Sequence, residues 1–130
     1  MIVSPQQVRL LRGADEADAP VEWRHADGEW AVAVELSDDR RIDEHASDAF
    51  EALCRAREGL ETDGWLIGLV GAQVDVWPSG MARDQGGGLT AYRHGPQGVI
   101  GVVDTFTPAD PTTAVTVAAQ RAAAAQAGLV

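Results

Sequence analysis

The sequence contains no lysine, only one cysteine, and no apolar run of the roughly 18 residues that a membrane-spanning helix requires. A single cysteine excludes an intrachain disulfide, and Cys54 falls on the apolar side of a predicted helix, where we expect a buried, unreactive side chain. The first twenty residues lack the basic start, apolar core and cleavage site of a secretory signal. These absences predict a soluble, cytoplasmic protein.

The absence of lysine also bears on the most glycine-rich part of the chain, Gly86–Gly88. A phosphate-binding P-loop needs a lysine followed by serine or threonine at the start of a helix, whereas these glycines precede a predicted strand. Ser79, in WPSGM, lacks the G-x-S-x-G surroundings of a nucleophilic serine. We therefore predict no nucleotide, no other cofactor and no catalytic residue.

Acidic side chains outnumber basic ones by 20 to 10, which gives a formal net charge of −10. Most of the excess lies in residues 1–63, which hold 16 of the acidic side chains and 7 of the arginines. A negative field of this size repels phosphate backbones, so we expect no nucleic-acid partner. The same field suits a basic protein partner, although acidic surfaces also simply keep small proteins in solution.

The clearest local pattern is a hairpin over residues 21–36. Two runs of alternating character flank Asp27-Gly28, a dipeptide that favours a two-residue turn. Such a turn places Trp23 and Trp30 opposite or diagonal to each other on one face of the sheet.

A helix is expected after this hairpin, over residues 48–62. Ser47 can cap its first turn, and apolar residues recur at helical spacing until Gly64. A start as early as Asp43 is the alternative.

The second half of the chain is typical of strands followed by a helix. The apolar run 65–77 predicts a strand near the middle of a sheet, with its two glycines marking a bulge or close packing. Residues 89–94 and 98–106 form a second hairpin around HGPQG. Asp110-Pro111 then begins an alanine-rich helix.

Together these elements predict an α+β fold. We expect an antiparallel or mixed sheet of about five strands, in the order β-β-α-β-β-β-α, with the helices on one face. Residues 1–130 form one domain in this interpretation, with 1–20 as a loosely attached segment and 13–20 as an exposed linker. Because a small open sheet leaves edges to protect, a structural homodimer is an alternative.

The stretch DVWPSGMARDQGGG, residues 75–88, is the strongest candidate for a binding site. Trp77 ends the predicted strand and is of a type enriched in interfaces, and the 11-residue connection 78–88 is long for a hairpin, which predicts a mobile loop. The guanidinium groups of the arginines in this region can each donate two parallel hydrogen bonds, which also suits a carboxylate or phosphate ligand. The predicted partner- or ligand-binding residues are Trp77, Ser79, Met81, Arg83, Asp84, Tyr92 and Arg93.

One pattern, Asp43, His45 and Asp48, has the residue types of a metal site. Three oxygen or nitrogen ligands at this spacing can bind a metal, yet no second cysteine or histidine cluster completes the set. The charged first turn of a helix explains the same residues, so we predict no metal.

The run DVWPSGMARDQGGGLTAY, followed by VVDTFTPADP and an alanine-rich end, resembles small uncharacterised single-domain proteins of high-GC Gram-positive bacteria. The small acidic α+β plan is also similar to that of immunity proteins from bacterial toxin systems. The second resemblance implies a protein that masks a toxin or enzyme by binding it. Neither resemblance implies a catalytic residue.

These observations favour a non-enzymatic, acidic protein-interaction module, and its specific form would be an immunity-type inhibitor of a basic toxin or enzyme. Acidic side chains would steer the partner while an apolar side chain supplies the central contact. The alternatives are a small-anion or small-molecule binding protein or enzyme that uses residues 77–93, and the homodimer. The acidic surface would consist of Asp38, Asp39, Asp43 and Glu44.

Overall fold

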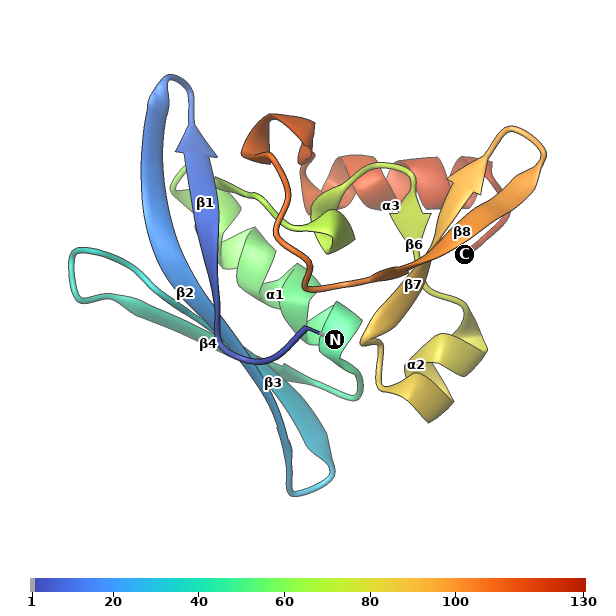
Figure 1. The fold of residues 1–130 in the computed structure, drawn as a ribbon, viewed down its shortest axis with the longest axis horizontal. Helices are drawn as coiled ribbons and strands as arrows, with labels where there is room; N and C mark the ends of the chain where they lie inside the picture. The colour runs from blue at the N-terminus through green and yellow to red at the C-terminus, as the bar shows by residue number, and fades with distance from the viewer. Residues whose placement is uncertain (1) are drawn as a thin grey trace.

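The computed structural model describes residues 2–130 and contains two antiparallel sheets and three α-helices (Figure 1). The larger sheet has the strand order β4-β3-β2-β1-β5 and the smaller one the order β6-β7-β8, which confirms the α+β class. The elements are β1 (Gln6–Arg12), β2 (Asp15–Ala26), β3 (Glu29–Glu35), β4 (Arg41–Ala46), α1 (Ala49–Thr62), β5 (Leu66–Ile67), the 3-10 turn η1 (Val70–Ala72), β6 (Val76–Trp77), α2 (Gly80–Gly86), β7 (Thr90–Gly95), β8 (Gly98–Asp104), the 3-10 turn η2 (Pro111–Thr113) and α3 (Val117–Gln126).

Consecutive hairpins build most of the large sheet. The β2–β3 pairing places His25 opposite Trp30 and Trp23 opposite Val32. Trp23 and Trp30 therefore lie at diagonal positions on one face, as predicted. The face of the sheet that turns toward α1 carries the main apolar core, and Figure 1 shows α1 on the inner side of the curled strands, toward the small sheet.

Residues 13–20 are not an exposed linker, because they belong to the first hairpin. Gly13, with φ of +61°, lies in the turn, and β2 begins two residues later. Ala17 and Ala19 pack on the core. Asp18, which lies between them, and Glu16, which precedes them, are exposed. The inward residues are small, so the alternation typical of a strand is weak in the sequence. β1 itself lies between β2 and β5.

The sequence does not predict β4, because its residues RIDEHA are mostly charged. This strand forms the edge of the large sheet beside β3 and includes Asp43, so α1 cannot start there. The N-cap of α1 is Asp48 rather than Ser47. The Asp48 carboxylate accepts a hydrogen bond from the backbone N–H of Glu51 at 2.8 Å.

The apolar run 65–77 is not one central strand, since it divides into β5, η1 and β6. A Cβ on Gly68 would lie 2.4 Å from the carbonyl oxygen of Ala109, and a Cβ on Gly71 would lie 2.8 Å from that of Thr105. The two glycines therefore mark close packing, as predicted. Because the chain turns to make these approaches, they also end the strand.

The C-terminal helix starts later than predicted. Asp110 caps η2, where its carboxylate accepts a hydrogen bond from the backbone N–H of Thr112 at 2.9 Å. The backbone is extended at Ala114, and Thr116 caps α3 through a bond from the N–H of Ala119 at 3.1 Å. Within residues 2–130, no helix combines the length and apolar character needed to span a membrane.

A buried arginine joins α1 to α3. Arg57 is 1% exposed, and its guanidinium donates to the side-chain oxygen of Gln120 and to the carbonyl of Val115 at 2.8 Å. Gln120 is itself fully buried, and burial lowers the pKa of Arg57. The amide nitrogen of Gln120 donates to the carbonyls of Gly71, Gln73 and Val76. These bonds fix the small sheet and α3 to α1.

Burial raises the pKa of the Cys54 thiol to about 11. An unfolded thiol loses its proton at about pH 8.5, so between that pH and about 11 the unfolded state releases a proton that the folded state keeps. We expect the free energy of unfolding to fall by up to about 1.4 kcal/mol per pH unit across this window. Urea denaturation at several pH values measures the fall, and Cys54→Ala should remove this component. Equal slopes in the two proteins would contradict the assignment.

Candidate functional site

Residues 78–88, predicted as a loop, contain the short capped helix α2. The Ser79 hydroxyl caps α2 by accepting a hydrogen bond from the backbone N–H of Ala82 at 3.0 Å. Gly87, with φ of +64°, ends the helix in the left-handed conformation. Helix capping therefore accounts for both Ser79 and Gly87. In the sequence alone they are only a serine and a glycine in a predicted loop.

The side chain of Arg83 connects α2 to the start of α1. Its guanidinium nitrogen lies 3.1 Å from the Asp48 carboxylate. The guanidinium carbon lies 5.2 Å from the ring centroid of Phe50 and 5.3 Å from that of Trp77. Trp77 is buried and meets Phe50 edge-on. Two of the predicted binding residues thus contact the interior of the protein.

Arg93, the second arginine of the predicted site, has partners of its own. Arg93 lies on β7 and donates to the carboxylate of Asp75 at 2.7 Å. Since Arg83 and Arg93 each pair with a carboxylate already, the structure gives no support to an anion site built on them. The remaining predicted residues are at least partly exposed: Met81, Asp84 and Tyr92.

The acidic side chains predicted to steer a partner are partly neutralised. The Asp38 carboxylate lies 2.8 Å from Arg40, and that of Asp43 lies 3.2 Å from Arg24. The net negative charge, most of which lies in residues 1–63, therefore does not rest on this group alone. The other two members, Asp39 and Glu44, are exposed in a turn and half-buried on β4, respectively.

The three residues of the metal pattern have separate roles. Asp43 and His45 lie on β4, where the Nε2 atom of His45 is 3.4 Å from a carboxylate oxygen of Asp43. Asp48 instead caps α1 and pairs with Arg83. Among residues 2–130, no group of three or more His, Cys, Asp or Glu side chains is arranged to hold a metal ion.

A free, apolar edge strand is the first feature that the sequence interpretation missed. Within residues 2–130, β8 pairs only with β7, and Figure 1 shows it at the outer side of the small sheet. Three aliphatic side chains on it are exposed: Val99 by 56%, Ile100 by 68% and Val102 by 66%. The β4 edge of the large sheet is charged, which discourages the addition of another strand. β8 carries no charged side chain before its last residue, Asp104.

The backbone of β8 offers unpaired groups along this edge. Thr105 donates its backbone N–H to the carbonyl of Leu89 at 3.0 Å, so this residue faces β7. Because backbone groups alternate in direction along an antiparallel strand, those of Val103 also face β7, and those of Val102 face outward. The N–H of Asp104 faces outward as well, whereas its carbonyl accepts a hydrogen bond from the N–H of Thr107 at 3.3 Å. A further strand could bond to the outward groups.

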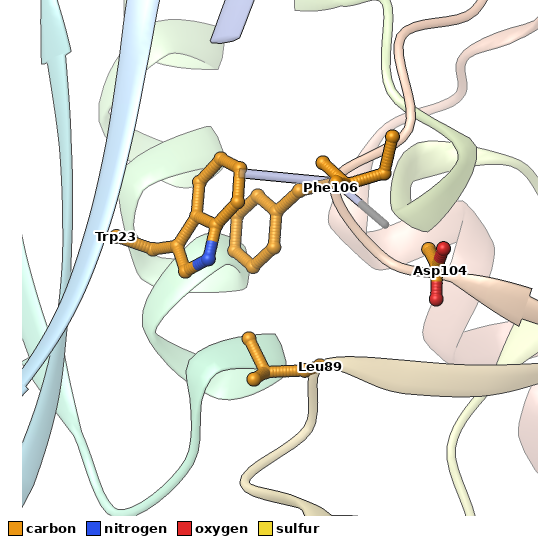
Figure 2. A pocket seen from close by; sticks show the side chains of 5 residues that line it. Trp23, Leu89, Asp104 and Phe106 are labelled. Carbon is orange, nitrogen blue, oxygen red and sulfur yellow. The ribbon is translucent and has the colours of Figure 1, made fainter. Parts of the chain in front are cut away.

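A pocket of about 180 Å³ lies between the two sheets, beside the end of β8 (Figure 2). Its floor is a stack of Trp23, from β2, on Phe106, with ring centroids 4.2 Å apart and planes inclined by 9°. Leu89 and Asp104 line it from the small sheet, and Ile2 completes the lining. The pocket is therefore aromatic and aliphatic with one carboxylate at its side.

The pocket continues the exposed face of β8. Val102 and Asp104 are two residues apart on a strand, so their side chains leave the same face of the sheet. Asp104 then lines the pocket whose floor includes Phe106. We call the surface formed by Val102, Asp104, Trp23 and Phe106 the β8 surface.

Local patterns in the sequence do not mark the β8 surface. The segment GVIGVVD has β-branched residues on both faces of a predicted strand, which is typical of burial and gives no sign of exposure. The partners Trp23 and Phe106 are 83 positions apart, so local patterns do not join them. No protein-family model matches the chain, and no curated protein matches it.

Proposed function

We propose that the protein is a non-enzymatic protein-binding module that accepts an extended segment of its partner as a fourth strand beside β8. The unprotected apolar edge carries this proposal, because it combines exposed aliphatic side chains with outward-facing backbone N–H groups at Val102 and Asp104. In this mode of recognition, main-chain hydrogen bonds supply affinity and neighbouring side-chain pockets supply specificity.

Charge favours a basic partner over a second copy of the chain. Two molecules that each carry a formal charge of −10 repel one another, whereas a basic protein is attracted at long range. An immunity-type inhibitor that masks a basic toxin or enzyme in the cytoplasm is one form of such a module. Because Asp38 and Asp43 are already in ion pairs, the steering is assigned to the net charge of the whole molecule.

A selection from randomised displayed peptides tests the proposal. Peptides enriched on the wild-type protein should bind Val102→Lys about tenfold or more weakly, because a charge on the strand opposes pairing at this edge. Val74→Lys is the matched control, since Val74 is another exposed valine outside β8 and the change in charge is the same. Its affinity should stay within about twofold of the wild-type value.

Amide hydrogen exchange gives an independent readout of strand addition. A bound peptide should slow exchange at Val102 and Asp104, whose N–H groups face outward in the free protein. The proposal fails if no peptide is enriched, or if both lysine variants weaken binding equally. It also fails if the protein alone forms a dimer that Val102→Lys dissociates, because β8 is then covered by a second copy.

A further inference from the structure

We propose that the pocket beside β8 binds an arginine side chain carried by the partner's extended segment. The inference rests on the proposed function and names the residue that gives it specificity. Three properties of the pocket carry it: its size, the chemistry of its lining and its position relative to β8.

The size of the pocket suits one side chain. Small-molecule and cofactor sites usually enclose about 300–1,000 Å³, whereas this pocket has about 180 Å³. Its lining includes Trp23 from the large sheet and Asp104, the last residue of β8, so a side chain of a strand placed alongside β8 can reach it (Figure 2).

The lining of the pocket suits a cation with a long apolar stem. A guanidinium binds well against aromatic rings and forms charge-assisted hydrogen bonds with a carboxylate, and the pocket offers Trp23, Phe106 and Asp104. Leu89 and Ile2 can cover the methylene groups of the stem. The lining contains no basic side chain that would oppose the cation.

The indole N–H of Trp23 favours an arginine that belongs to a peptide over a free guanidinium compound. Figure 2 shows the indole nitrogen on the side of the ring nearer to Leu89, which also lines the pocket. Arginine side chains have only donors, but a peptide also brings carbonyl oxygens. One of these oxygens can accept the indole N–H.

The register of an added strand brings a side chain to the pocket. In a strand paired with β8, the residue opposite Asp104 has its side chain on the same face as Asp104, about 5 Å away. The residue two positions along then lies opposite Val102. The segment recognised should therefore carry arginine and an aliphatic residue two positions apart.

A double-mutant cycle tests this assignment. In an enriched peptide, replacing the arginine with norleucine should weaken binding to the wild-type protein by about tenfold, because the pocket then loses its cation. Asp104→Asn should weaken binding of the arginine peptide by about fivefold and leave the norleucine peptide nearly unaffected. Glu58→Gln, which removes one exposed negative charge outside the pocket, is the matched control and should change neither affinity.

A small probe tests the pocket without β8. N-acetyl-arginine-N-methylamide should shift the indole N–H resonance of Trp23 in a nuclear magnetic resonance titration, and the norleucine analogue should not. The resonance is identified by its loss in Trp23→Phe.

The outcomes separate this inference from the proposed function. If peptides bind through β8 but show no arginine preference, and Asp104→Asn behaves like Glu58→Gln, the pocket assignment is wrong and the proposed function stands. If no peptide binds but the small probe shifts Trp23, the pocket assignment stands and the proposed function is wrong. An absence of any shift with the probe, together with an arginine-independent peptide set, overturns the inference.

Discussion

Replacing Arg57 with alanine is expected to lower the free energy of unfolding by about 4 kcal/mol. The substitution leaves the buried side-chain oxygen of Gln120 and the partly buried carbonyl of Val115 without their donor. It also leaves a cavity, because Arg57 is among the largest fully buried side chains. Unpaired polar groups and lost packing therefore act in the same direction.

Arg55→Ala provides the matched control for this prediction. Arg55 lies on the same helix, is exposed, and donates to the carbonyl of His45. Its loss should cost less than about 1 kcal/mol. Urea denaturation of both variants measures the difference, and a loss in Arg57→Ala no greater than in Arg55→Ala would show that the buried guanidinium does not hold α1 to α3.

Gly88→Ala is expected to destabilise the protein by about 3 kcal/mol or more. Gly88 has φ of +73°, a conformation that L side chains rarely adopt. An added Cβ would also lie 2.7 Å from the Asp48 carboxylate and 2.7 Å from the backbone nitrogen of Phe50. Because the second contact is with the first turn of α1, it cannot be relieved by rotating a side chain.

Two other glycines separate the contributions of strain and close contact. Gly28 has φ of +78° and no atom within 4 Å of an added Cβ, so Gly28→Ala should cost only the backbone strain, about 1 kcal/mol. Gly80 has neither a positive φ nor a close neighbour, and Gly80→Ala should be neutral or slightly stabilising. Thermal or urea unfolding of the three variants checks this order. A cost at Gly88 equal to that at Gly28 would mean that the junction with α1 relaxes freely.

The sequence predicted best the elements whose cause lies within a few residues. Asp27-Gly28 and the HGPQG segment both produce the hairpins expected of them, because turn chemistry is local. β4 was missed because its charged side chains are explained only by its position at a sheet edge. The division of 65–77 was missed because the close approaches of Gly68 and Gly71 involve residues more than thirty positions away.

The candidate site shows the same limit more sharply. Residue type singled out Trp77 and Arg83, but the partner of Arg83 is Asp48, which lies 35 positions earlier in the chain. The exposure of Val102 depends on what the rest of the fold leaves uncovered, which periodicity cannot express. Arg57 falls at the helical spacing of the apolar residues Leu53 and Leu60, which places it on the buried face of α1. Its acceptors lie 63 and 58 positions later in the chain, so no local pattern reveals what pairs with it.

The hydrogen bond between Arg57 and Gln120 has a consequence for the order in which the chain acquires its structure. β1 to β4 pair with their neighbours in sequence, so this part can assemble while the chain is still being synthesised. The guanidinium of Arg57, by contrast, can bond to Gln120 only after the 63 residues that follow it have been added. Until α3 arrives, α1 carries a charge without its final acceptors, so the interior is completed only after the two sheets have been made.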